Sequence, residues 1–241
     1  MALQSFSFDG ARFRVGKWRA RGDLAYLVPL SPAHTLTTEA LAKARAALDA
    51  QGFDEIVTAA VAPAERAALL RDGFEEREQL HLLTHDLQSL PAPGRLAWRS
   101  RPRIERGHSA DRPAVLDLDS RTFEEFWQLD DEGLTDAMDA TPVSRLRVIR
   151  GTAEAPIVGY AVSGRAGNQG FLQRLAVDPS RQGAGLGTAL VHDALRWMRR
   201  RGATVGWVNT QEANDRALAL YEHLGFRPAD HQLTVLARAV R

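Results

Sequence analysis

The residues with the clearest chemical potential are three glycines spaced two residues apart at the start of an expected helix. They lie in Gln182-Gly183-Ala184-Gly185-Leu186-Gly187-Thr188, which follows an apolar strand-like stretch at residues 171–177. Glycine lets the backbone approach a bound group closely, and a helix N-terminus offers unpaired N–H groups and a positive dipole to an anion. The segment therefore predicts a pyrophosphate cradle that needs neither a lysine nor a metal ion.

Two common nucleotide motifs do not fit this segment. A P-loop ends in Gly-Lys-Ser/Thr, whereas Gly187 is followed directly by Thr188. A dinucleotide fingerprint needs Gly-x-Gly-x-x-Gly, and the third glycine here comes one residue too early. Taken alone, the segment fits a flexible turn with helix-start glycines equally well.

The elements that must position this loop follow it in the sequence. Residues 186–201 have the apolar periodicity of an amphipathic helix, which ends at Gly202 after three arginines that suit the negative end of its dipole. A strand is expected at 203–208, a second helix at 212–224 and a last strand at 226–236. Before the loop, residues 111–140 carry helical signals, and a helix opened by Pro63 and closed near Gly73 is expected at 63–71. The second helix carries one apolar stripe, formed by Ala217, Leu220, Tyr221 and Leu224.

These segments together resemble the GNAT superfamily of acyl-CoA-dependent N-acyltransferases. The family signature, Gln/Arg-x-x-Gly-x-Gly/Ala, fits residues 182–187, and Asn214 followed by Tyr221-Glu222-His223-Leu224-Gly225-Phe226 is similar to a second family segment. The resemblance covers residues 103–238 and is strongest over 171–227. It implies a mixed α/β fold with a mostly antiparallel central sheet flanked by helices.

The resemblance implies acetyl-CoA as the cofactor and no metal. In the family, the strand at 171–177 and the next strand splay apart, and the pantetheine arm pairs with the backbone of the first, while the loop amides hold the pyrophosphate. Arg181 is either a further phosphate contact or a solvated loop residue. The implied cofactor-binding residues are Leu175, Ala176, Val177, Gln182, Gly183, Ala184, Gly185, Leu186, Gly187, Thr188 and Asn214.

Tyr221 is the catalytic residue that the resemblance implies. Acyl transfer to an amine expels a thiolate, and a nearby phenol O–H can protonate it or stabilise its charge. Tyr221 lies seven residues after Asn214, which places the two on one helix face. The alternative is that its ring only packs in the core.

The general base is not apparent. Many family members have a glutamate early in the strand before the loop, where this sequence has Phe171, Leu172, Gln173 and Arg174. Glu124, Glu125, His108 or a bound water are possible substitutes. Phe123, Phe126 and Trp127 either line part of the acceptor pocket or pack in the core.

The sequence thus predicts an N-acetyltransferase in which an amine of unknown identity attacks acetyl-CoA directly in a ternary complex. The missing glutamate motivates an alternative, a non-catalytic acyl-CoA sensor or interaction module. A net charge of +1, from 31 basic and 30 acidic residues, indicates neither a nucleic-acid nor a membrane partner. The absence of cysteine, long apolar runs and a secretory leader predicts a cytoplasmic protein of bacterial type. The oligomeric state stays open.

A Pro- and Gly-containing linker at 88–102 divides the sequence into a lobe at 1–87 and the acetyltransferase domain at 103–241. Gly52 and Gly202, like the pairs Gly73-Phe74 and Gly225-Phe226, lie about 150 residues apart. We therefore predict a degenerate partial GNAT-like copy at the N-terminus. It has Pro32 and no glycine where the cradle should be, so we expect it to bind no CoA.

Overall fold

The computed structural model describes residues 4–19, 21–90 and 102–240. They form two compact units, and each unit includes a segment from the other half of the chain. The first unit contains the described residues up to Leu82 with residues 209–215 and 228–240, and the second contains Leu83–Val208 and Arg216–Arg227. Most of the expected linker, residues 91–101, lies outside the described residues. The predicted boundaries at residues 87 and 103 divide the chain in sequence order. The compact units differ from them, because each unit combines segments from both halves of the chain.

The sheet of the first unit has the strand order β1-β2-β3-β4-β12-β5. Its neighbours are antiparallel except β3 and β4, which run parallel. The elements that the first half of the chain contributes are β1 (Gln4–Phe8), β2 (Ala11–Trp18), β3 (Arg21–Pro29), the 3₁₀ turn η1 (Ala33–Thr35), α1 (Thr38–Asp49), β4 (Glu55–Thr58), α2 (Pro63–Arg71) and β5 (Glu75–Asp86).

Local sequence signals explain both helices of this unit. The Thr37 hydroxyl accepts a hydrogen bond from the Ala40 N–H at 3.2 Å and so caps α1. Pro63 opens α2, where its missing N–H costs nothing. The helices bury residues such as Leu41 and Leu69 with Phe13 of β2 in one core, which fixes them against the sheet.

The sheet of the second unit has the strand order β10-β9-β8-β7-β6. Leu87 adds to it, because its N–H donates to the Thr204 carbonyl at 3.0 Å. The elements are β6 (Ile104–Arg106), η3 (Ser109–Asp111), α3 (Arg112–Thr122), η4 (Glu125–Trp127), α4 (Asp131–Asp139), β7 (Val143–Arg150), β8 (Ile157–Ala166), β9 (Gln169–Val177), η5 (Pro179–Arg181), α5 (Leu186–Arg200), β10 (Val205–Gln211), α6 (Asp215–His223) and β11 (Arg227–Pro228).

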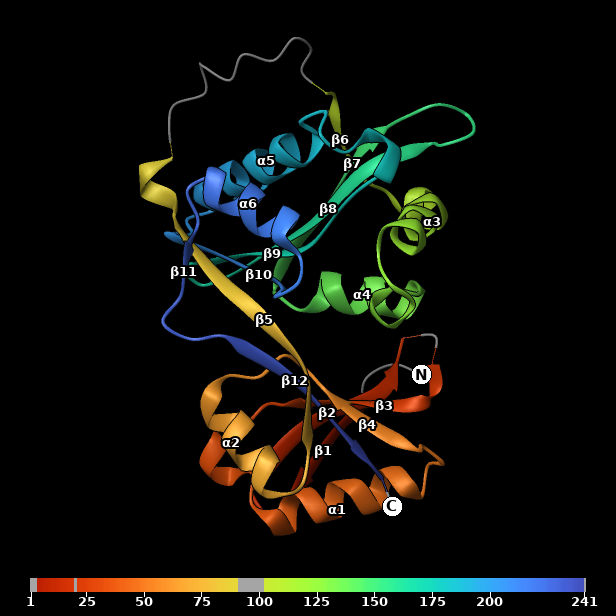
Figure 1. Ribbon diagram of the computed structural model, residues 1–241, viewed down its shortest axis with the longest axis vertical. Coiled ribbons are helices and arrows are strands. Elements are labelled where there is room, and N and C mark those ends of the chain that lie inside the picture. Colours follow the sequence, from red (N-terminus) through yellow and green to blue (C-terminus); the bar gives the residue numbers. More distant parts are fainter. Residues whose placement is uncertain (1–3, 20, 91–101, 241) are drawn as a thin grey trace. The chain divides into compact units, whose positions relative to one another are not determined.

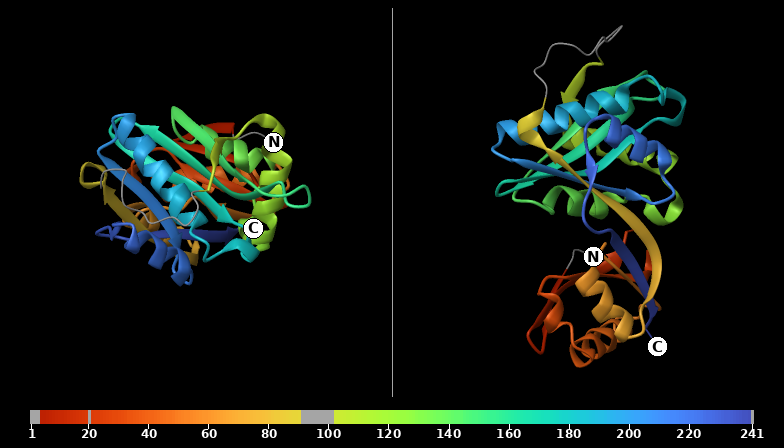
Figure 2. Two further views of the ribbon diagram at one scale, coloured as in Figure 1. Left: turned by 90° about the horizontal axis from the view of Figure 1, so that it is seen from above. Right: turned by 60° about the vertical axis from the view of Figure 1, so that its left-hand side comes forward.

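Helices cover both faces of this second sheet (Figures 1 and 2). A Cβ atom added at Gly170 or Gly206 would meet α5, at Met198 and Leu195 respectively. Side chains alternate across a strand, so Phe171 and Trp207, the next residues along, point to the opposite face. On that face Val115 and Leu118 of α3 and Leu134 of α4 form a separate core with Tyr160 and Val162 of β8.

The predicted fold class, a mixed and mostly antiparallel α/β sheet flanked by helices, is confirmed. Two element predictions need correction. The helical signals over residues 111–140 belong to two helices, because Phe123 is extended and the chain turns through η4. The last strand is interrupted, with β11 ending at Pro228 and β12 (Leu233–Ala239) beginning five residues later.

Sequence reasoning also missed β1 and β2. Their signal was present, since buried Phe13 and Val15 alternate with Arg12 and Arg14 along β2. In the described part of the chain, no helix is long and apolar enough to cross a bilayer.

Candidate active site

A fork between two parallel strands dominates the second unit. β10 pairs with β9 only from Val205 opposite Gln169 to Trp207 opposite Phe171. β9 continues to Val177, and its other edge stays paired with β8 as far as Gly159. From Leu172 to Val177, therefore, β9 turns an edge toward β10 that no β10 residue pairs with. The expected splaying of these strands is confirmed.

Hydrogen bonds within the loop after β9 hold it in place. The Asp178 carboxylate accepts from the Ser180 N–H at 2.9 Å and the Ser180 hydroxyl at 2.6 Å, and it lies 2.5 Å from the Arg121 guanidinium. The Ser180 hydrogen bonds, followed by Arg121, hold the pKa of Asp178 below its usual value. Gln182 donates from Nε2 to the Val177 carbonyl at 3.2 Å. Its side chain thus folds back onto the strand that the loop leaves.

The three glycines of the loop have two different structural roles. Gly183 and Gly185 adopt φ of +79° and +80°, which side-chain-bearing residues rarely adopt. Gly187 is helical, and a Cβ there would lie 3.2 Å from Leu220 of α6. The first two glycines therefore shape the turn, whereas the third allows α5 and α6 to pack closely.

The N-terminus of α5 has no side-chain cap in the described structure. Its N-cap is Gly185, whose carbonyl accepts the first helical hydrogen bond, from the Ala189 N–H at 3.0 Å. The N–H groups of the first helical turn have no partner within a helix, and residues 185–188 are only partly buried. These observations fit an anionic group such as a pyrophosphate at this end of α5.

Tyr221 is buried on α6, with 5% of its surface exposed. Its ring packs 5.5 Å from the Phe226 ring in the core that α5 and α6 share. Burial raises the pKa of its phenol, and the positive charge of Arg174 opposes this rise. Tyr221 therefore keeps its proton at neutral pH and is a hydrogen-bond donor rather than a base.

Asn214 directly precedes α6, and its N–H donates to the Gln211 carbonyl at 3.0 Å. Its segment, residues 209–215, packs with the first unit. Its cofactor contact stays a prediction. Leu175 and Val177 are partly buried and Ala176 is fully buried, as expected for a strand with helices on both faces.

The proposed substitutes for the missing glutamate lie in different places. Glu124 and Glu125 are exposed at η4. His108 caps η3, with its backbone N–H donating to Asp111 at 2.8 Å. Gln173 occupies a β-bulge, because Val162 pairs with Arg174 and the next β8 residue, Ser163, pairs with Leu172. Its carboxamide cannot take up a proton at neutral pH.

A buried ion pair beside this bulge escaped the sequence analysis. Arg174 donates from Nε and Nη2 to both oxygens of Asp119, at 2.8 and 2.9 Å. Asp119 is fully buried and also accepts from the Tyr160 hydroxyl and, at 2.7 Å, from the Leu129 N–H. The only sequence signal was one charged residue, Arg174, in a strand whose other residues are uncharged. Its partner lies 55 residues away.

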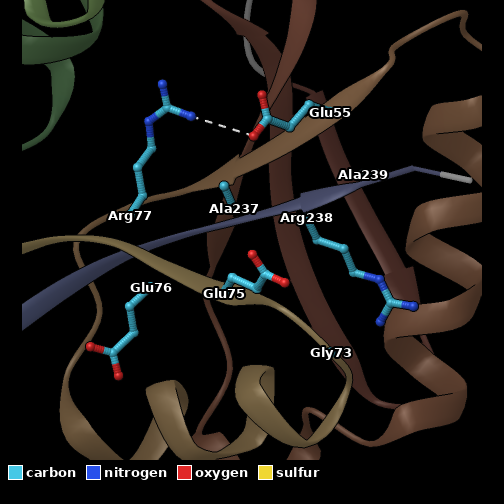
Figure 3. Close-up of a pocket in the computed structure, with 8 residues that line it drawn as sticks. All are labelled: Glu55, Gly73, Glu75, Glu76, Arg77, Ala237, Arg238 and Ala239. Carbon is cyan, nitrogen blue, oxygen red and sulfur yellow. Dashed lines mark hydrogen bonds and ion pairs between the residues drawn. The ribbon is translucent and has the colours of Figure 1, made fainter.

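The first unit also contains a pocket, of about 450 Å³, which is open to solvent (Figure 3). Its charges pair locally: Arg77 lies 3.4 Å from Glu55, and Arg66 pairs with Glu76. The lining residues are Glu55, Gly73, Glu75, Glu76, Arg77, Ala237, Arg238 and Ala239. It lacks the glycine turn and the strand fork of the second unit.

Residues 112–226 match the model of the acetyltransferase (GNAT) family. This match identifies a GNAT acetyltransferase domain at these residues. A stretch of 78 residues is 33% identical to the [ribosomal protein bS18]-alanine N-acetyltransferase of Escherichia coli K12, covering 32% of this chain and 53% of that protein. A stretch of 59 residues is 48% identical to the mycothiol acetyltransferase of Beutenbergia cavernae, covering 24% of this chain and 20% of that protein. The chain thus spans about half the length of the first relative and less of the second.

Several solved structures resemble the chain over nearly its whole length. One of them is a tandem GNAT protein from the clavulanic acid biosynthesis pathway, with a TM-score of 0.71 and 15% identity, covering 96% of this chain and 79% of that one. At this identity the likeness shows the fold alone. It supports the tandem arrangement predicted from the spacing of the glycines.

Proposed function

We propose that the protein transfers the acetyl group of acetyl-CoA to an amine, by direct attack of the amine in a ternary complex. The observation that carries this proposal is the fork between β9 and β10 leading into the uncapped, glycine-shaped start of α5. An open strand edge and a set of free helical N–H groups, joined by one short loop, suit a ligand with an amide-containing arm and a pyrophosphate. GNAT family membership of residues 112–226 supports the same assignment.

Backbone groups do most of the binding in this proposal. The edge of β9 at Leu175, Ala176 and Val177 pairs with the pantetheine arm as an added strand would. The amides of the loop, from Gln182 through Gly183, Ala184, Gly185, Leu186 and Gly187 to Thr188, hold the pyrophosphate. When bound, acetyl-CoA supplies the activated acetyl group.

Tyr221 stabilises the departing sulfur in this proposal. A thiol ionises near pH 8.5, whereas burial raises the pKa of Tyr221 above its usual value of 10.0. The phenol therefore stays protonated while negative charge develops on sulfur, and it donates a hydrogen bond to that charge. No carboxylate of β9 is available to take the proton of the amine, so that proton must pass to another group, such as Glu124, Glu125, His108 or a bound water.

The test is incubation of the purified protein with acetyl-CoA and a panel of amines, with release of free CoA measured against an enzyme-free control. Acetylated product identified by mass spectrometry would support the proposal. Tight binding of acetyl-CoA without transfer to any amine would favour the alternative, a non-catalytic acyl-CoA sensor.

A further inference from the structure

The β-bulge at Gln173 changes which side chains of β9 face α3 and α4. Leu172 and Leu175 pack in the core with α5, whereas Arg174 reaches Asp119 of α3. Without the extra residue, strict alternation would place Arg174 on the same face as Leu172. The bulge thus delivers a charged side chain to the face opposite α5, just before the open edge of β9 that the proposed function uses. Bulges often re-aim a side chain next to an active site.

The guanidinium of Arg174 is held rigidly on two sides. Nε and Nη2 donate to Asp119, and Nη2 donates in addition to the Trp127 carbonyl at 2.7 Å. The Phe123 ring lies 3.5 Å from the guanidinium carbon and covers one face of it. These contacts also fix the segment between α3 and α4, because Asp119 holds the Leu129 N–H.

One edge of this guanidinium remains open. Nη1 carries two N–H groups, and within the described residues neither has a hydrogen-bond partner. The side chain keeps 11% of its surface exposed, whereas that of Asp119 has none. Among the described residues, Nη1 is therefore the donor of this guanidinium that a ligand could use.

The surroundings favour an oxygen-bearing ligand at this edge. The Phe123 ring covers one face of the guanidinium, and the Asp119 carboxylate and the Trp127 carbonyl accept from Nε and Nη2, which leaves Nη1 as the donor for a ligand. The charge of Arg174 is also felt at Tyr221, on the helix after the fork. Hydrogen bonds from a guanidinium to an anionic oxygen are about twice as strong as neutral ones, so a carboxylate gains most here.

We propose that Arg174 determines acceptor specificity by binding, through Nη1, a carboxylate that the acceptor carries close to its amine. This inference rests on the proposed function. It assigns amino-acid-like amines as acceptors and disfavours simple alkylamines and diamines, which bring no anionic oxygen to the site. Asp119 acts as a positioning residue, because it fixes the plane of the guanidinium.

The test compares three matched acceptors: phenylalanine, its amide and 2-phenylethylamine. We expect kcat/KM of the wild type to be highest for phenylalanine, intermediate for the amide and lowest for 2-phenylethylamine. Arg174→Gln should lower kcat/KM for phenylalanine roughly 10- to 100-fold more than for 2-phenylethylamine, as expected for loss of a charged hydrogen bond. Arg174→Lys keeps the charge without the fixed fork and should give a partial loss of discrimination. Arg150→Gln, which removes an exposed partner of Asp111, should leave the ratio between acceptors unchanged.

An equal loss for all three acceptors in Arg174→Gln would overturn the inference, because a structural role lowers every rate alike. A wild type that does not prefer the carboxylate would overturn it as well. Calorimetry with CoA present separates the inference from the proposed function. If phenylalanine binds the wild type but not Arg174→Gln, and no amine is acetylated, the carboxylate site stands and the transferase proposal fails. If all three amines are instead acetylated equally well, the transferase proposal stands and the carboxylate site fails.

Discussion

The helix starts of the two units show what separates a ligand site from a structural turn. In the second unit α5 begins at Gly185, with φ of +80° and no side-chain cap in the described structure. In the first unit α1 begins at Thr37, whose hydroxyl occupies the Ala40 N–H, and the turn before it contains Pro32. A helix N-terminus that satisfies its own donors has fewer to offer an anion.

The strands before these helices differ in the same sense. β3 and β4 stay paired from Leu24 opposite Glu55 to Leu27 opposite Thr58, and the next residue, Ala59, still donates to the Leu27 carbonyl at 2.9 Å. β9 and β10 part after Phe171 and Trp207. We therefore propose that only the second unit binds CoA. In this proposal the fold alone does not create the site, which depends in addition on the strand fork and the uncapped helix start.

Tyr221→Phe should have the largest effect on catalysis. It removes the proposed donor to the departing sulfur but keeps the ring that packs on Phe226, so turnover should fall roughly 10²- to 10⁴-fold with little change in CoA affinity. Steady-state kinetics and calorimetry measure the two. Tyr26→Phe, a hydroxyl deletion in the first unit, is the control. Equal turnover in wild type and Tyr221→Phe would reduce Tyr221 to a packing residue.

Asp72→Ala should be the most destabilising change in the first unit. The Asp72 carboxylate is buried, 3.3 Å from Arg45 and 3.0 Å from Arg238. Its removal leaves Arg45 and Arg238 without their counter-charge. Both arginines are partly exposed, so the cost should be about 1.5–3 kcal/mol, as for lost hydrogen bonds to a charged group. Denaturant unfolding followed by tryptophan fluorescence should show the loss. If the second unit carries the site, acetyl-CoA should still bind below the unfolding midpoint, and loss of binding by the folded variant would contradict the comparison.

Gly185→Val should abolish the stabilisation that acetyl-CoA confers. A ligand at a hundredfold excess over its Kd stabilises the native state by about 2.7 kcal/mol, and the substitution strains the positive-φ turn that shapes the proposed cradle. Gly202→Val is the matched control, since Gly202 has φ of +86° at the other end of α5. The control should lose intrinsic stability but keep its thermal shift with acetyl-CoA. If Gly185→Val kept its thermal shift with acetyl-CoA, the loop would not be part of the acetyl-CoA site.

Calorimetry of the same variants sharpens the comparison between the units. Wild type should bind one CoA per chain, and Gly185→Val should bind none. A second site in the wild type, or a residual site in the variant, would show that the first unit is not degenerate.

Thr37→Ala should have the smallest effect. Loss of an N-cap hydroxyl costs typically about 1 kcal/mol of stability, with no change in acetyl-CoA binding. Thermal unfolding with and without acetyl-CoA measures both. A new binding event in Thr37→Ala or Thr37→Gly would show that the cap is what keeps the first unit from binding CoA.

Much of the site could be predicted because its signals are local. The glycine-rich turn and the apolar periodicity of α5 lie within a single stretch of sequence, and the structure has a turn and a helix at these residues. The helix α2 was predicted with its observed limits for the same reason, since Pro63 and Gly73 mark its two ends. By contrast, the break at Phe123 was missed, because the apolar spacing of the flanking helices continued across it.

What only the tertiary structure decided depends on residues far apart in the chain. The ion pair of Arg174 with Asp119 and the bulge at Gln173 come from pairings with α3 and β8, which no local pattern encodes. No local pattern encodes the placement of β5 and β12 either. The last residues of β5 belong to the second unit, and β12 belongs to the first unit. A strand's own sequence specifies which of its faces is apolar, but its neighbour is chosen by the edge that is left unpaired when the rest of the sheet has formed. The sequence by itself therefore predicted the glycine turn and the helix that follows it, because both depend on neighbouring residues. The tertiary structure decided where β9 and β10 part and which acid pairs with Arg174.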